Sequence, residues 1–290
     1  MKILITGGAG QLAQEFQEYI KINFPDFVVL APSHKDLDVT SSTQVEKIVN
    51  DFRPDLIINT AAYHKVDECE TNIERTFAVN ALGAYIVAKN ARDIGAKSIY
   101  ISTGFVFDGE KETPYEESDE TRPINIYGHS KALGEKLVSI CDPLAYIVRT
   151  NALFGRFSGK NTKGGAGNFI DFVWSKAKAG ENLDMVSDQR IAPTFTEDLV
   201  RACISLVQDK ASGGIYHLTN SGEASWFEVA KKVYEIAGAK SVVKSITSEQ
   251  RNAPAKRPKN ALLANKKRTI LPGWEESVAA HLKLKIEREN

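Results

Sequence analysis

The sequence contains few cysteines and no excess of one charge. Its 290 residues include three cysteines, Cys69, Cys141 and Cys203, which are far apart in the chain. Such thiols match neither a disulfide framework nor a zinc-binding pattern, so we expect reduced thiols and a cytoplasmic location. Lysine plus arginine and aspartate plus glutamate number 37 each, which makes the formal net charge zero. This balance gives no electrostatic reason to expect a nucleic-acid partner.

Long hydrophobic runs are also missing. No apolar segment approaches the ~20 residues that a membrane-spanning helix needs, so we expect no membrane partner. The first residues read as a strand, 2–6, and not as an apolar signal segment with a cleavage site. The five histidines have no metal-ligand spacing, so no metal site is predicted. Hydrophobic residues nevertheless make up 42% of the chain, enough for a substantial core.

The first half of the chain alternates short apolar runs with helical patterns. Strands are predicted at 2–6, 27–31, 56–59, 98–102 and 145–149, and helices at 11–23, 41–52, 72–94 and 127–140. The strands are apolar throughout, which is typical of a parallel sheet covered on both faces. This order predicts an α/β protein with a doubly wound, Rossmann-type sheet.

The pattern becomes less regular after residue 154. Residues 155–167, rich in Gly, Lys and Ser, predict a loop, and we interpret it as a lid over the substrate. Helices are predicted at 168–179, 196–208 and 225–237, and a strand at 215–219. We assign 1–154 to a dinucleotide-binding domain, to which about 168–219 returns, and 155–290 mainly to a smaller substrate-binding lobe.

Two helix starts have the spacing of a capping box. Ser41 is followed three residues later by Gln44, and Ser225 by Glu228. In this motif each side chain accepts a hydrogen bond from the backbone N–H of the other residue. Both helices are therefore expected to begin at these serines.

A glycine-rich turn joins the first predicted strand to the first helix. Residues 8–13 match the pattern G-x-G-x-x-G/A. We expect Gly8 to allow the tight turn, Gly10 to let the backbone approach a phosphate, and Ala13 to let the helix pack closely. Because a helix amino terminus attracts anions, the turn predicts a dinucleotide cofactor, although an ordinary strand–turn–helix is the alternative.

The second predicted strand ends without the acidic residue that would bind the ribose of NAD. Ser33, His34 and Lys35 follow it instead and could meet a 2′-phosphate. These residues favour NADP slightly and leave NAD open. Asp38 and Val39, in the next loop, are expected beside the adenine.

Tyr127 and Lys131 are four residues apart in a predicted helix. This spacing places two side chains on one helix face. A nearby ammonium favours a phenolate, so we expect Lys131 to lower the pKa of Tyr127 and to hold the nicotinamide ribose. The phenol would then be the proton donor when a hydride is added to a ketone. The alternative is a chance pair on a surface helix.

Two strand ends are expected beside this pair, because ligands of parallel sheets bind at the carboxyl ends of the strands. Thr103 ends one strand, and its hydroxyl is expected to bond the substrate carbonyl and the phenol. Ala61, Ala62 and Tyr63 follow another strand, where small residues leave room for the nicotinamide ribose. Close packing against a helix is an equal explanation for the two alanines.

Together these motifs resemble an extended short-chain dehydrogenase/reductase, and more narrowly the dTDP-4-dehydrorhamnose reductase family. The matching segments run through most of the chain: 7–12, 53–55, 59–62, 66–70, 79–80, 102–109, 127–131, 149–150, 168–169, 188–189, 192–194, 214–217 and 257–258. The resemblance implies NAD(P)H-dependent reduction of the C4 ketone of a dTDP-linked 6-deoxyhexose, as in dTDP-rhamnose and polysaccharide biosynthesis. It leaves a homodimer open.

The resemblance also implies roles for individual residues. The catalytic residues would be Tyr127, Lys131 and Thr103. Cofactor contacts would come from Gly7, Gly10, Gln11, Leu12, Asp38, Val39, Ala61, Ala62, Tyr63, Tyr127 and Lys131. The substrate would meet Thr103 and Gly104, with Asn168 and Arg257 at its diphosphate, because a guanidinium suits bidentate phosphate contacts.

Several residues depart from the family's usual pattern. Gly104 and Phe105 replace an acid and a tyrosine, Ala152 replaces a tryptophan, and Ile191 replaces a glycine. These changes are expected around the sugar, whereas the acid–base pair is intact. A reductase or epimerase of a different nucleotide sugar is therefore one alternative. A non-catalytic, cofactor-binding subunit, like the regulator of methionine adenosyltransferase, is another.

Overall fold

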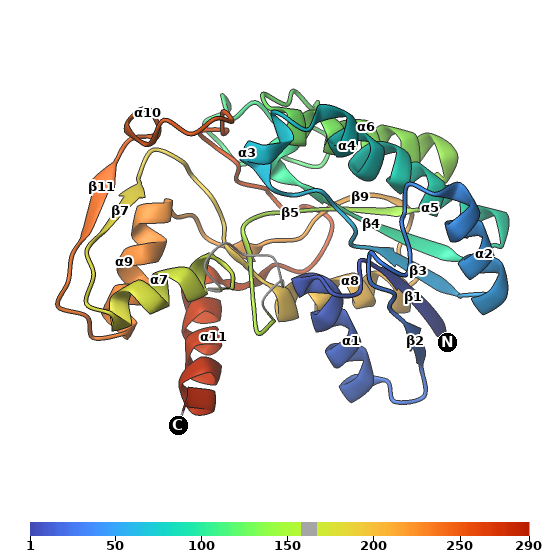
Figure 1. Ribbon diagram of the computed structural model, residues 1–290, viewed down its shortest axis with the longest axis horizontal. Helices are drawn as coiled ribbons and strands as arrows, with labels where there is room; N and C mark the ends of the chain where they lie inside the picture. The colour runs from blue at the N-terminus through green and yellow to red at the C-terminus, as the bar shows by residue number, and fades with distance from the viewer. Residues whose placement is uncertain (158–166, 290) are drawn as a thin grey trace.

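The structure is a computed structural model that describes residues 1–157 and 167–289. A six-stranded parallel sheet is the centre of the larger part of the molecule (Figure 1). Its strands, in spatial order, are β2 (Val28–Leu30), β1 (Lys2–Thr6), β3 (Leu56–Asn59), β4 (Lys97–Thr103), β5 (Tyr146–Thr150) and β9 (Gly214–His217). The order reverses beside β1, so the carboxyl ends of β1 and β3 meet at a switch point, where ligands of such sheets bind. The predicted doubly wound fold is confirmed.

Helices cover both faces of this sheet because its strands are apolar on both sides. On one face α1 (Gln11–Asn23) and α8 (Thr196–Gln208) pack over Ile3 and Ile5. On the other face α2 (Ser42–Phe52) and α5 (Ala84–Asp93) cover Leu4 and Ile57, and α6 (Ile126–Cys141) joins α5 over Tyr100. Successive strand side chains point to opposite faces, which produces the two core layers.

A second hydrophobic cluster includes Trp174, Val229 and Val278, and the helices that carry these residues lie on the left in Figure 1. Its elements are α7 (Phe169–Lys178), α9 (Trp226–Ile236), α11 (Trp274–Glu289) and the parallel pair β7 (Leu183–Val186) and β11 (Val243–Ile246). Two short parallel pairs join the parts: β6 (Leu153–Phe154) with β8 (Thr194–Phe195), and β10 (Asn220–Ser221) with β12 (Leu271–Gly273). The short helices are α3 (Val66–Cys69), α4 (Ile73–Phe77), η1 (Ala78–Gly83), η2 (Gly104–Val106) and α10 (Ser248–Arg251).

Two local details differ from the sequence predictions. The helix expected at 72–94 is divided into α4, the π-helical η1 and α5. Ser41 caps α2, but the Gln44 side chain accepts from the Asp38 N–H, so this start is no capping box. The box at Ser225 forms. Of the stretch 168–219, α8 and β9 join the large sheet and its core, whereas α7 and β7 belong to the second cluster. The predicted lid lies largely outside the described residues.

Candidate active site

The glycine-rich turn is closed by Gly7 and Gly10, with Gly8 as one of its two central residues. Gly7 has a positive φ of 69°, and its carbonyl accepts the Gly10 N–H at 2.8 Å. Gly8 is needed for a different reason, since a Cβ there would lie 2.0 Å from the Ala31 carbonyl oxygen at the end of β2. Ala13 is fully buried, in keeping with a closely packed α1.

The amino terminus of α1 has the features of an anion site. Gly10 is its N-cap and supplies no side-chain hydrogen bond, and the first turn has no acidic residue. Free N–H groups and the helix dipole favour a phosphate at such an end. The Nε2 of Gln11 is buried and has no hydrogen-bond partner among the described residues. Leu12, in contrast, packs in the core, so its contribution to a pyrophosphate is limited to its backbone. These residues fit a dinucleotide.

The residues expected at the adenosine end divide into two groups. His34 and Lys35 are exposed beyond β2, and the Ser33 hydroxyl bonds the Asp36 carboxylate at 2.5 Å. Asp38 accepts from the Thr40 backbone N–H at 2.9 Å, which lowers the pKa of its carboxyl group. The exposed pair is available to a ligand, whereas Asp38 already has a structural partner.

Val39 is buried, whereas the residues after β3 are only partly buried. Val39 is 4% exposed and faces Gly83, where a Cβ would come within 2.9 Å of it. The Ala61 backbone lies against Gly7, 3.2 Å from a Cβ built there, so the two predicted cofactor segments adjoin. Tyr63, which follows Ala62, donates its hydroxyl to Glu68 at 3.0 Å.

The three predicted catalytic side chains come from β4 and the first turns of α6. The Asn125 side chain begins α6 by accepting the Gly128 N–H at 2.7 Å. Tyr127 follows this cap, and its phenol hydrogen-bonds Thr103 at the end of β4. The Lys131 Nζ donates to the Ile101 carbonyl at 2.6 Å. The structure therefore brings both α6 side chains to the last residues of one strand.

Burial shifts the pKa values of both α6 groups. It raises the pKa of Tyr127 to about 12, and the Thr103 hydrogen bond opposes the rise only in part. It lowers the pKa of Lys131 to about 7, against the opposing charge of Glu135. The lowered pKa that was expected for Tyr127 beside Lys131 is not found in this structure, because loss of water around the phenol is the largest influence on its pKa and raises it.

Two supporting residues were not predicted from the sequence. Asn80 in η1 accepts the Tyr63 N–H at 2.8 Å and donates to the Ser130 hydroxyl at 3.0 Å, which ties the loop after β3 to α6. Glu135 accepts from Ser102 at 2.5 Å and from Arg149 at 2.7 and 2.9 Å, all within the core. A polar residue inside an apolar helix pattern was the signal for each.

On the expected sugar side of the site, Gly104 lies against Asn151. Its N–H donates to the Asn151 side-chain oxygen at 3.0 Å, and the Asn151 amide donates to the Ala261 carbonyl. Phe105 meets the Tyr127 ring edge to face at 6.0 Å. Ala152 has a positive φ of 44°, which a non-glycine residue seldom adopts. Asn151 was not proposed from the sequence, and its polar side chain at a strand end was the available signal.

The two residues expected at the diphosphate have partners in the protein. Asn168 caps α7, and its side-chain nitrogen donates to the Gly155 carbonyl and to Asp171. The Arg257 guanidinium forms a two-pronged pair with Asp67, with both distances 3.0 Å. Neither side chain is free in the structure, so a diphosphate contact would have to share or replace these bonds.

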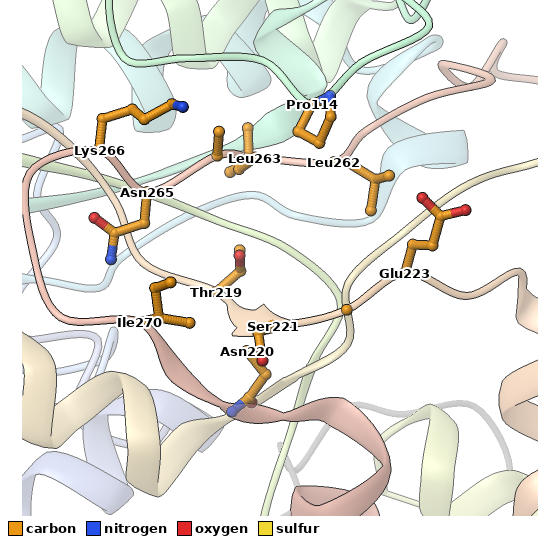
Figure 2. Close-up of a pocket in the computed structure, with 12 residues that line it drawn as sticks. Pro114, Thr219, Asn220, Ser221, Glu223, Leu262, Leu263, Asn265, Lys266 and Ile270 are labelled. Carbon is orange, nitrogen blue, oxygen red and sulfur yellow. The ribbon is translucent and has the colours of Figure 1, made fainter.

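A cavity of about 400 Å³ lies apart from the predicted catalytic residues, none of which lines it. Figure 2 shows Pro114 and Lys266 on one side of it and Asn220 and Ile270 on the other. Lys266 pairs with Glu116, which lies outside the cavity lining. Both charged residues that line the cavity, Lys266 and Glu223, are therefore paired within the protein, Glu223 with Arg190.

Within 1–157 and 167–289, no group of three or more potential ligands could hold a metal ion. In this part of the chain, no helix has the length and apolar character needed to cross a membrane.

The chain is similar to known proteins over nearly its whole length. A family model described as "RmlD substrate binding domain" matches residues 1–285. The dTDP-4-dehydrorhamnose reductase of Sinorhizobium fredii is 35% identical over 292 residues, covering 96% of this chain and 95% of that protein. The spore coat polysaccharide biosynthesis protein SpsK of Bacillus subtilis is 33% identical, covering 97% of this chain and 96% of that protein.

The chain is also similar to solved structures over nearly its whole length. The dTDP-4-dehydrorhamnose reductase of Bacillus anthracis, in complex with NADP, has a TM-score of 0.91 and 35% identity, covering 98% of this chain and 99% of that one. The UDP-glucose 4-epimerase of Thermus thermophilus, in complex with NAD, has a TM-score of 0.79 but 19% identity, so that likeness concerns the fold alone.

Proposed function

The chain belongs to the RmlD substrate-binding-domain family, and from this premise we propose that it reduces the C4 ketone of a dTDP-linked 6-deoxy sugar with NADPH or NADH. The observation that carries the proposal is the meeting of Tyr127, Thr103 and Lys131 at the end of β4. The S. fredii and B. anthracis relatives bear the name of such a reductase. A cytoplasmic location remains part of the proposal.

The chain's own residues can donate the proton that this reaction needs. When bound, the reduced nicotinamide supplies the hydride that adds to the carbonyl carbon. Tyr127 then donates its proton to the developing alkoxide, and a phenol with a pKa of about 12 still carries that proton at neutral pH. Thr103 orients the phenol by the hydrogen bond between them. Lys131, with a pKa of about 7, can return a proton to the phenolate, because its ammonium is the stronger acid.

The cofactor would bind where Gly7, Gly10 and Gln11 form the turn into α1. Residues 1–154 with α8 and β9 would form its domain, and the second cluster would form the sugar-nucleotide lobe. Exposed His34 and Lys35 support NADP over NAD, since the Lys35 ammonium offers positive charge, and the His34 ring a hydrogen bond, where the ribose would lie. NADH is retained as the alternative.

A second candidate function differs from the first in the sugar of the substrate. Asn151 fills the space beside Gly104, where the resemblance calls for an acid. A site with a different polar group discriminates strongly between sugars that differ by one hydroxyl. A reductase of another nucleotide-linked 4-keto sugar is therefore the second candidate function.

The test is loss of NADPH absorbance with purified full-length protein and a panel of nucleotide-linked 4-keto sugars. We expect turnover with a dTDP-linked 6-deoxy sugar, and a loss of roughly 10²–10⁴ in kcat for Tyr127→Phe. The variant should still bind NADPH, which fluorescence titration can measure. Turnover of only a differently linked sugar would favour the second candidate. Cofactor binding without turnover of any sugar would contradict both and point to a regulatory subunit.

A further inference from the structure

The Lys131 ammonium lies in the protein interior with few polar neighbours. The residue is 1% exposed, and among the described residues its Nζ has one hydrogen-bond acceptor, the Ile101 carbonyl at 2.6 Å. Glu135, one helical turn further, uses its carboxylate for Ser102 and Arg149 instead. An ammonium has three N–H donors, and burying its charge without compensation is unfavourable. Something else must stabilise this group.

The ring of Tyr100 lies where such a partner is needed. The Lys131 Nζ is 4.0 Å from the centroid of this ring. Tyr100 is 2% exposed and precedes Ile101 in β4, so ring and carbonyl approach the ammonium from one strand. The face of an aromatic ring is electronegative and attracts a cation, more strongly when water is excluded.

The ring cannot turn away, because its hydroxyl is fixed. The Tyr100 hydroxyl donates to the Asn80 carbonyl at 2.8 Å. Asn80 lies in the π-helical η1, and such wide turns often occur at functional sites. The hydroxyl passes beneath α6 at Gly134, where a Cβ would lie 2.3 Å from the Tyr100 oxygen. Helix packing therefore determines the ring's position.

We propose that Tyr100 is a positioning residue of this site, whose ring face holds the Lys131 ammonium in place and favours its charged form. The proposal rests on the proposed function for the catalytic use of Lys131. The other ionisable groups around the site are Tyr127 and Glu135 on α6, Arg149 on β5 and Cys69 on α3. The Glu135 charge also favours the ammonium but is matched by Arg149, so the ring is a further partner of Lys131 beside the Ile101 carbonyl.

The test compares two rings of nearly equal shape at position 100 of the full-length protein. Tyr100→Phe keeps the electronegative face and loses only the hydroxyl, whereas pentafluorophenylalanine reverses the polarity of the face. The readout is the pH midpoint of the Lys131 side chain, followed by NMR of ¹³C-lysine-labelled protein. Lys131→Arg identifies the signal. No substrate is needed, so failure of the proposed reductase activity would not obscure the result.

We expect the Lys131 midpoint in Tyr100→Phe to stay near that of the parent. In the pentafluorinated protein it should fall by about one pH unit, because the charged form loses its partner. With an active substrate, the high-pH limb of kcat should move in the same direction. Equal Lys131 midpoints in the two variants would overturn the proposal, whether both stay near the parent value or both fall. An equal fall would indicate a role for the hydroxyl alone.

Discussion

The carboxamide of Asn151 occupies the space directly beside the backbone of Gly104. The amide oxygen accepts the Gly104 N–H at 3.0 Å, and the amide nitrogen donates to the Ala261 carbonyl. A Cβ on Gly104 would lie 2.6 Å from both amide atoms. The ends of β4 and β5 and a segment after residue 260 are thus joined next to Thr103. The position of the Asn151 side chain requires glycine at 104, so a side chain added at 104 would displace Asn151.

Gly104→Ala should therefore lower stability and activity together. Overpacking of a buried site typically costs about 1–3 kcal/mol, and displacement of Asn151 would disturb the neighbouring Thr103. Urea unfolding measures the first effect and kcat the second. Gly273→Ala is the matched control, because a Cβ there meets no atom within 4 Å. Equal, small effects at both positions would contradict the dependence.

Lys131 should make stability depend on alkaline pH. Its folded pKa of about 7 lies below the ordinary value of 10.5. Between these values the unfolded chain binds a proton that the folded protein does not bind, so stability rises as pH increases through this window. Lys131→Met lacks the effect, since it has no proton to exchange.

The stability difference between parent and Lys131→Met isolates this residue from other groups. From pH 7 to pH 10 it should shift in favour of the parent by roughly 3–5 kcal/mol. Urea unfolding at several pH values measures the shift. Parallel stability curves for the two proteins would show that Lys131 titrates normally in the folded state.

Local patterns were sufficient to predict much of the fold. The helix expected at 196–208 has those bounds, and the capping box at Ser225 forms, because both depend on residues close together in the chain. The Tyr127–Lys131 spacing likewise placed both residues on α6. The assignment of catalytic roles to them remains a prediction.

What the sequence missed depends on contacts between distant residues. The need for glycine at position 8 comes from the carbonyl of Ala31, on a neighbouring strand. The pKa of Lys131 reflects burial by the whole fold rather than its neighbour one turn away. The pairing of Arg257 with Asp67 joins residues 190 positions apart, and the assignment of Arg257 to a diphosphate remains a prediction. No local pattern reports such contacts.

Cofactor choice should respond to the charge beyond β2. Lys35→Ala removes an exposed positive group where a 2′-phosphate would lie. We expect the KM for NADPH to rise roughly ten- to a hundredfold, since a hydrogen bond to a charged group is worth about 1.5–3 kcal/mol. The KM for NADH should change little, because NADH lacks that phosphate.

Lys47→Ala is the control for nonspecific loss of charge, since Lys47 lies on the exposed face of α2 with its side chain 77% exposed. Initial-rate kinetics with each cofactor provide both constants. An equal rise for NADPH and NADH in Lys35→Ala would contradict the assignment of this residue to the 2′-phosphate.

Neutralising one partner of the buried ion pair of Glu135 and Arg149 should lower the stability of the protein strongly. The two side chains are 5% and 2% exposed, and their closest atoms are 2.7 Å apart. Glu135→Gln keeps the size of the side chain but leaves a buried guanidinium without its counter-charge. Breaking a buried pair in this way costs about 3–5 kcal/mol. Urea unfolding at pH 7 measures the loss.

Asp51→Asn breaks the pair of Lys47 and Asp51, whose side chains are 77% and 65% exposed, and should have no measurable effect. Similar losses in the two variants would refute the argument from burial. Replacing Glu135 and Arg149 together by methionines should recover much of the stability, because no uncompensated charge then remains. Since Glu135 also supports the charged form of Lys131, the double variant should regain stability without regaining full kcat. That separation would distinguish the role of Glu135 in folding from its role beside the catalytic lysine.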